Sequence, residues 1–115
     1  ARTPAERVYI SSVFHNRLKK DWRLDCDPTV RYGLRKFKGP LTSRDLVSDS
    51  PFNTYRRRGL PPTPICSPGV AALEAALDPA DVDFLYYVLT DTEGNHFFTS
   101  DYDEFLEAKE QAPEQ

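Results

Sequence analysis

The chain has 115 residues, of which 39% are hydrophobic and 12% aromatic, a length that fits one small domain with a modest core. Its formal net charge of −3 argues against a dedicated nucleic-acid binder, because such proteins usually present a strongly basic face. The basic run Arg56-Arg57-Arg58 is best explained as a solvated loop tip. No stretch approaches the roughly 20 apolar residues that a membrane span requires.

Proline positions predict the first two helices. An amphipathic helix is expected over residues 4–18, since Pro4 suits a first turn and apolar residues recur at helical spacing. Asp27 followed by Pro28 predicts a second helix over residues 28–34, in which Asp27 is the N-cap and Pro28 the first helical residue.

Two further helices are indicated by their end signals. Thr42 is expected to cap a short helix over residues 43–47, with Asp45 within reach of the first-turn amides. A helix with a packable apolar face follows Gly69 and is ended by Asp78 and the proline after it.

The last third of the chain predicts a β-hairpin followed by a helix. Residues 84–90 are aromatic and β-branched, a turn is expected over 91–95, and 96–99 return as the partner strand. Ser100 or Asp101 then caps an acidic helix over residues 102–112. The predicted fold class is α+β: several helices packed on a small antiparallel sheet that contains a C-terminal β-hairpin, in a single domain over 1–115.

The loop over residues 50–69 is the most informative segment for function. It is too rich in proline for a helix or a central strand, and too apolar and aromatic for a solvated linker. Asn53, Thr54 and Tyr55 lie beside a stiff turn at 59–62, which suits one wall of a cleft for a polar ligand. The alternative for Asn53, and likewise for Asn16, is that the amide caps backbone groups inside the fold.

The remaining reactive side chains indicate no cofactor and no metal. Cys26 and Cys66 either form a disulfide or remain two buried free thiols, and His15 and His96 lack metal-ligand spacing. The lysines look solvated, so no Schiff-base lysine is expected, and no glycine-rich phosphate loop is present. Asp25 and Asp27 lie in no surroundings that would obviously raise a carboxyl pKa, as a general acid requires.

Taken in order, five segments closely resemble the catalytic domain of the MltG/YceG-like endolytic murein transglycosylases, with matching spacing over nearly the whole chain. They are residues 13–18, 24–33, 50–55, 59–69 and 76–88. The resemblance implies a cleft like that of lysozyme and other transglycosylases. It also implies a membrane-anchored protein whose catalytic domain lies on the extracytoplasmic side of the bacterial cytoplasmic membrane.

The implied activity is non-hydrolytic cleavage of the MurNAc–GlcNAc linkage in nascent peptidoglycan, which leaves anhydro-muramic ends. The family uses one glutamate as general acid and then base, in an Ile/Val-Glu-Lys-Glu context upstream of residue 1. The resemblance therefore implies a fragment without that glutamate or the membrane anchor, inactive by itself. The implied partners are glycan strands and cell-wall synthases. The alternative is a non-catalytic peptidoglycan-binding or cell-wall-synthesis interaction module.

The same resemblance assigns candidate sugar contacts and no catalytic residue. The contacts would use amide and hydroxyl hydrogen bonds together with a stacking ring. In order of preference, the candidates are Asn53, Thr54 and Tyr55, then Asp27, Thr29 and Tyr32, then Asn16.

Overall fold

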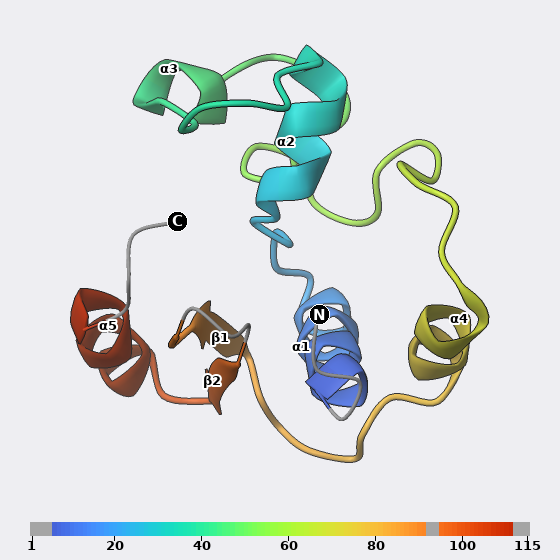
Figure 1. The fold of residues 1–115 in the computed structure, drawn as a ribbon, viewed down its shortest axis with the longest axis vertical. Coiled ribbons are helices and arrows are strands. Elements are labelled where there is room, and N and C mark those ends of the chain that lie inside the picture. The colour runs from blue at the N-terminus through green and yellow to red at the C-terminus, as the bar shows by residue number, and fades with distance from the viewer. Residues whose placement is uncertain (1–5, 92–94, 112–115) are drawn as a thin grey trace. The chain divides into compact units, whose positions relative to one another are not determined.

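The structure, a computed structural model, describes residues 6–91 and 95–111. Over these residues it contains five helices and one two-stranded antiparallel sheet, which confirms the predicted α+β class (Figure 1). By their contacts the described residues divide into two compact units, and the single domain over 1–115 stays a prediction. Residues 17–67 form what we call the loop unit, and residues 6–16 with 68–91 and 95–111 belong to the hairpin unit.

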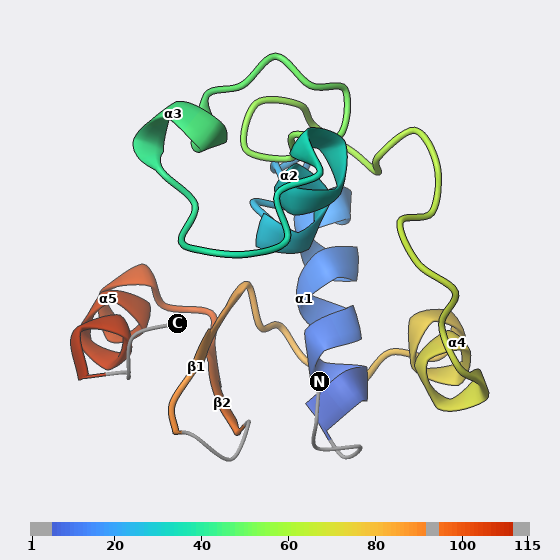
Figure 2. The same cartoon turned by 45° about the horizontal axis from the view of Figure 1, so that its top comes forward.

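The hairpin unit is built around the predicted pair of strands. β1 (Tyr86–Leu89) pairs antiparallel with β2 (His96–Thr99), and Tyr87 lies opposite Phe98. The hairpin lies between α1 (Arg7–Lys19) and α5 (Tyr102–Gln111), as Figures 1 and 2 show. Residues 92–94 of the expected turn lie outside the described residues.

Aromatic side chains cover the face of the hairpin that meets α1. The ring centroids of Phe14 and Tyr87 are 6.0 Å apart, and those of Tyr9 and Phe98 are 5.5 Å apart. Phe84 stacks on Phe98 at 5.6 Å and completes this cluster. These edge-on and offset arrangements are the favoured geometries for aromatic pairs, and they pack the hairpin against α1 with rings that stay partly exposed. The buried apolar residues of the unit are Val13, Ala75, Leu85 and Val88.

The opposite face of the hairpin is covered by α5. Tyr86 stacks on Phe105 with 5.2 Å between ring centroids, and the hydroxyl of Thr99 donates to the carboxylate of Glu104 at 3.1 Å. Because side chains alternate across a strand, covering both faces requires apolar residues at successive positions. This explains why the strand sequence shows a continuous aromatic run.

Two polar side chains of the first helical segment fix the strands in place. The carboxylate of Glu6 accepts from the backbone N–H of His96 at 3.2 and 3.0 Å, and its Oε1 lies 3.1 Å from His96 Nδ1. The Nδ2 of Asn16 donates to the carbonyls of Val82 and Phe84, both at 2.9 Å. The Glu6 bonds hold the start of β2, and the Asn16 bonds hold the segment that leads into β1.

The helices that flank the hairpin begin and end where their local signals predict. α4 (Val70–Leu77) follows Gly69 and ends at Asp78. α5 begins after Asp101, whose Oδ1 accepts from the backbone N–H groups of Asp103 and Glu104 at 2.8 and 3.1 Å. Of the two predicted caps, Asp101 is therefore the one that is used.

In the loop unit, α2 (Asp27–Leu34) ends at the predicted residue but begins one residue earlier than predicted, with a different cap. The extended residue before the helix is Cys26, which makes no side-chain capping bond, and Pro28 lies in the first turn. Asp27 is already helical, so the prediction that it is the N-cap is wrong. Its carboxylate is free to bind elsewhere, which matters for the candidate site.

The short helix α3 (Ser43–Leu46) has the predicted capping box. The hydroxyl of Thr42 accepts from the backbone N–H of Asp45 at 3.1 Å, and Oδ2 of Asp45 accepts from the backbone N–H of Thr42 at 2.8 Å. The same carboxylate oxygen lies 2.6 Å from Nζ of Lys36. This ion pair ties α3 to the segment that follows α2.

The pKa of Asp45 makes the stability of the loop unit depend on pH. The hydrogen bond from Lys36, helped by that from Thr42, lowers this pKa from 3.8 to about 2. A lowered pKa means that the stabilisation is complete above about pH 4 and is lost as the pH falls towards 2. We expect the difference in unfolding free energy between the wild type and Asp45→Asn to shrink over this interval in urea titrations.

A second variant tests the cause of this dependence. Lys36→Met removes the dominant partner of the carboxylate, so its unfolding free energy should lack the same pH-dependent component. If the curves of the wild type and Asp45→Asn run parallel from pH 6 to pH 2, the ion pair does not stabilise the folded state.

Candidate functional site

The start of α2 is joined to the loop at 50–69 by two buried threonines. Thr54 is 2% exposed and Thr29 is 5% exposed, and their hydroxyl oxygens lie 2.9 Å apart. The hydroxyl of Thr54 also accepts from the backbone N–H of Cys26 at 2.8 Å, and that of Thr29 donates to the carbonyl of Cys26 at 2.7 Å. These contacts use both hydroxyls inside the fold, so Thr29 and Thr54 position the site and are not exposed for a ligand.

Asn53 is fully buried and shapes the loop itself. Its Nδ2 donates to the carbonyls of Leu46 and Ser48 at 3.0 and 2.8 Å, and its Oδ1 accepts from the backbone N–H of Tyr55 at 3.0 Å. The alternative raised by the sequence, that this amide caps backbone groups, describes its position. An amide with 0% exposure has no surface left for a sugar, so the expected direct contact is not available to Asn53.

Tyr55 and Asp27 bring the two predicted motifs together at the surface. The Tyr55 hydroxyl donates to Oδ1 of Asp27 at 2.5 Å, across 28 positions of sequence. Burial, and then the hydrogen bond to Asp27, raise the pKa of Tyr55 well above its usual value. The hydroxyl therefore stays protonated and acts as a donor, which leaves the second carboxylate oxygen of the exposed Asp27 as an acceptor for a ligand.

An aromatic pair follows one turn further along α2. Tyr32 is 39% exposed, and its ring meets that of Phe52 edge-on at 4.9 Å between centroids. Gly33 permits this approach, because a Cβ built there would lie 2.3 Å from Oγ of Ser50. The sequence analysis did not select Phe52 as a site residue, although its place in the loop just before Asn53 was a usable signal.

The carboxyl pKa of Asp25 differs from what the sequence suggests. Partial burial raises the pKa of its carboxyl, while Arg17 and Arg23 oppose the change. Its backbone has φ 50°, in the left-handed region that aspartate tolerates better than most residues. The backbone N–H of Asp25 donates to the carbonyl of Thr54 at 3.2 Å, which adds to the connection between the loop and α2.

The last predicted contact residue, Asn16, lies in the hairpin unit and has a structural task. Its Nδ2 is used by the two carbonyls that lead into β1. Of the seven predicted residues, the structure thus brings four together around the start of α2 and leaves a surface suited to a ligand on three. The four are Asp27, Thr29, Thr54 and Tyr55, and the three are Asp27, Tyr32 and Tyr55.

The two cysteines are free thiols. Cys26 is half-buried and Cys66 is exposed, so the structure has neither the disulfide nor the pair of buried thiols that the sequence left open. Burial raises the pKa of the Cys26 thiol and makes it a poorer nucleophile at neutral pH.

No group of histidine, cysteine or acidic side chains suited to holding a metal ion occurs within residues 6–91 and 95–111. In the same part of the chain, no helix combines the length and the apolar character needed to cross a membrane.

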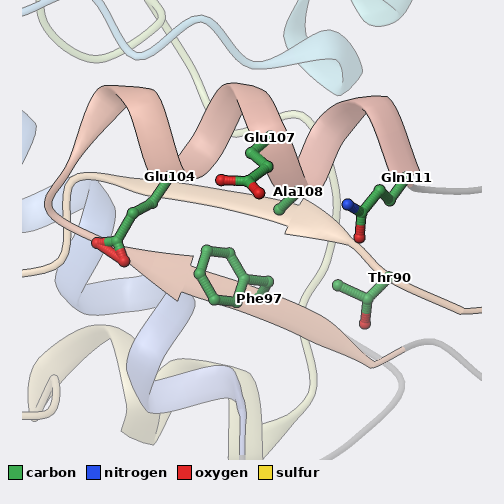
Figure 3. A pocket seen from close by; sticks show the side chains of 6 residues that line it. All are labelled: Thr90, Phe97, Glu104, Glu107, Ala108 and Gln111. Carbon is green, nitrogen blue, oxygen red and sulfur yellow. The ribbon is translucent and has the colours of Figure 1, made fainter.

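A hollow lies in the hairpin unit, between the strands and α5, and none of the predicted site residues lines it. It has a volume of about 390 Å³, and Figure 3 shows Phe97 of β2 facing Glu107 and Ala108 of α5, with Glu104 at one end. At the other end, Gln111 lies above Thr90. Its lining is mixed, with an aromatic ring on the strand side and two carboxylates on the helix side.

Comparison with known proteins settles the family. The sequence profile of the YceG-like family matches residues 1–111. The chain belongs to the YceG-like family. This confirms the resemblance inferred from the five motifs.

Individual relatives agree with this membership. A Bacillus subtilis protein named endolytic murein transglycosylase is 46% identical over 110 residues, which are 96% of this chain and 30% of that protein. A Streptococcus pneumoniae protein of the same name is 31% identical over 104 residues, 86% of this chain and 19% of that protein. The crystal structure of a YceG-like protein from Listeria monocytogenes has a TM-score of 0.82 at 46% identity, over 85% of this chain and 32% of that one. The chain thus spans about a third or less of the relatives that it matches.

Asn53 provides a test of the buried part of the site. Asn53→Asp replaces the amide donor by an oxygen of similar size, so that a carboxylate faces the carbonyls of Leu46 and Ser48. We expect the free energy of unfolding to fall by about 3 kcal/mol, because a buried group loses two partners and gains a charge. Urea denaturation followed by circular dichroism measures this.

Asp49→Asn serves as the control, since it makes the opposite exchange in the same loop. The Asp49 side chain is 86% exposed and contacts Arg56 and Arg57 at 3.8 and 3.3 Å. Exposed ion pairs of this kind contribute about 0–1 kcal/mol, so this variant should remain close to the wild type. Equal effects of the two substitutions would contradict the structural role of Asn53.

Thiol reactivity tests the placement of the cysteines. Under native, non-reducing conditions at pH 8, we expect Cys66 to react with a disulfide reagent about tenfold faster than Cys26, because Cys66 is exposed and burial raises the pKa of the Cys26 thiol. Comparing Cys66→Ser with Cys26→Ser assigns the two phases. If neither cysteine reacts until the protein has been reduced, the two cysteines form a disulfide instead.

Proposed function

We propose that this chain is the glycan-binding part of an endolytic murein transglycosylase. The observation that carries the proposal is the 46% identity over 96% of the chain to the Bacillus subtilis protein of that name. The proposed substrate is a nascent peptidoglycan strand, cut at its MurNAc–GlcNAc linkage without water, which leaves an anhydro-muramic end. The site geometry supports a sugar ligand, since sugars present the hydroxyl groups that a carboxylate and a tyrosine hydroxyl can bind.

In this proposal, Asp27 and Tyr55 hold one sugar hydroxyl. The bond from Tyr55 to Oδ1 orients the Asp27 carboxylate, and the second carboxylate oxygen accepts from the sugar. Tyr32 offers part of its ring as a stacking surface, held edge-on against Phe52. Thr29, Thr54 and Asn53 act indirectly, by fixing the backbone from which these side chains project.

The cleavage chemistry requires a general acid that then acts as a base. A glutamate in the segment before residue 1 of the whole protein would protonate the glycosidic oxygen as the bond to the anomeric carbon breaks. The same group would then take the proton from a hydroxyl of the muramic sugar as that oxygen attacks the anomeric carbon. In this scheme the residues described above bind and orient the strand and transfer no proton.

The proposal extends to location and partners. The whole protein is anchored in the bacterial cytoplasmic membrane with this part on the extracytoplasmic side, where nascent glycan strands are made. Cell-wall synthases are the proposed protein partners, because they supply the uncut strand. Both statements rest on family membership and on the substrate proposed here.

A non-catalytic peptidoglycan-binding module is the second candidate. The observation that favours it is that the exposed carboxylate of Asp27 is already paired with Tyr55, an arrangement suited to binding. Such a module would bind glycan strands with the same residues and leave them intact, so the two candidates differ only in the product.

The experiment incubates the full-length protein with purified glycan strands and identifies the products by mass spectrometry. The transglycosylase proposal expects anhydro-muropeptides. Tyr55→Phe should lower kcat/KM about tenfold, since a hydrogen bond to a charged group that orients the ligand is lost. Tyr102→Phe is the matched control, because it removes a tyrosine hydroxyl from the exposed α5 and should leave the rate unchanged.

The products separate the candidates. Hydrated reducing ends would indicate a hydrolase and contradict the proposed reaction. Intact strands that nonetheless bind the protein, with weaker binding by Tyr55→Phe, would indicate the binding module. If Tyr55→Phe forms anhydro ends as fast as the wild type, Tyr55 does not contribute to the site.

A further inference from the structure

α4 presents large apolar side chains on its outer side. Val70, Leu73 and Leu77 are 72%, 49% and 86% exposed. Their spacing of three and four residues places them on one face of the helix, where they form a continuous apolar stripe. We call this the α4 stripe. Soluble proteins rarely leave such a contiguous apolar surface uncovered unless it serves an interaction.

A groove runs beside the α4 stripe, between this helix and the first turn of α1. It has a volume of about 530 Å³. Val8, Ala71 and Ala75 give it an apolar lining of small and medium side chains, and Leu77 belongs both to the groove and to the stripe. Small side chains allow another helix to approach closely, since the distance between helix axes depends on the residues at the contact.

Hydrogen bonds hold the two walls of the groove together. The backbone N–H of Ala80 donates to the carbonyl of Val8 at 3.1 Å, and His15 Nε2 lies 2.9 Å from the carbonyl of Ala76. Both bonds join α1 to α4 or to the residues just after it. A groove with fixed walls needs little reorganisation when it receives a partner, which favours binding.

The position of α1 indicates which segment reaches the groove. The helix begins at Arg7, and both Arg7 and Val8 line the groove. The described chain therefore enters α1 at the edge of this groove. The relatives are about three times as long as the chain, which spans 30% of the Bacillus subtilis protein and 32% of the Listeria monocytogenes structure.

We propose that the α4 stripe and its groove dock the segment of the whole protein that precedes residue 1, in the form of an amphipathic helix. Apolar residues of that helix, spaced three and four apart, cover Leu73 and Leu77 and fill the groove over Ala71 and Ala75. One further part of the docking rests on the proposed function: the docked segment carries the general acid. The contact then fixes where that acid lies relative to the hairpin unit.

The charges at the rim of the groove define the orientation of the docked helix. Arg7 lies on the α1 side, and Glu74 and Asp78 lie on the α4 side. A docked helix that pairs with both sides carries acidic residues towards α1 and basic residues towards α4. Charges at a rim contribute mainly to register and specificity, whereas the apolar stripe provides the contact itself.

Site-specific photo-crosslinking of the full-length protein tests the occupant. Leu77 is replaced by p-benzoylphenylalanine, and Leu60, which is 73% exposed in the loop unit, is replaced in the control. The expected result is an intrachain crosslink from position 77 to a peptide that precedes residue 1, and none from position 60. A crosslinked dimer, a crosslink to another protein or to residues 17–67, or no crosslink would overturn the proposal.

Hydroxyl-radical footprinting gives a second readout without substitution. In the native full-length protein, we expect Leu73 and Leu77 to be oxidised about fivefold more slowly than in the unfolded protein, as for residues at the centre of an interface. Leu60 should react almost as fast as in the unfolded protein. Equal rates for the three leucines would overturn the proposal.

Neither experiment depends on catalysis, so its failure is distinct from that of the proposed function. A crosslink from position 77 in a protein that releases no anhydro-muropeptides would support the docking proposal and contradict the proposed transglycosylase activity. Anhydro-muropeptides from a protein without that crosslink would keep the reaction and reject the docking.

Discussion

Two threonine hydroxyls 2.9 Å apart, Thr29 on α2 and Thr54 in the loop at 50–69, set the position of the other groups at the candidate site. The loop has little regular structure of its own, and this pair joins it to the start of the helix through Cys26. Tyr55 follows Thr54 directly in the chain, so the hydroxyl pair also determines where its ring lies and whether it reaches Asp27. The exposed chemistry of the loop unit therefore depends on a buried, fully bonded polar contact.

Local signals were sufficient to predict most of the fold. The starts of α3 and α4 follow from the capping box of Thr42 with Asp45 and from Gly69, and Pro28 locates the start of α2 to within one residue. Each of these signals acts within a few residues, and the structure keeps it. The cap of α2 was predicted wrongly because a carboxylate before a proline is the usual cap, whereas a distant tyrosine binds this one.

The roles of the site residues could not be predicted in the same way. Asparagine and threonine suit both a sugar and a backbone carbonyl, so their presence in a proline-rich loop located the site without assigning them. What decides their roles is contact over a long distance in sequence: Thr54 meets Thr29 across 25 positions, and Asn16 meets Val82 across 66. Such pairings are a property of the folded chain, and a single sequence does not specify them.

The residues of α4 are arranged in the reverse of the usual order for a surface helix. Small Ala75 is buried at 6% exposure, while the larger Leu73 and Leu77 lie outside. Alanine buries little apolar area, so this packing contributes little stability. The hydrogen bonds of His15 and Ala80 also hold the helix against α1. A helix that faced only its own core would place its leucines inwards. Apolar residues on both sides are typical of a helix between two partners, and only one of those partners, α1, lies within the described residues.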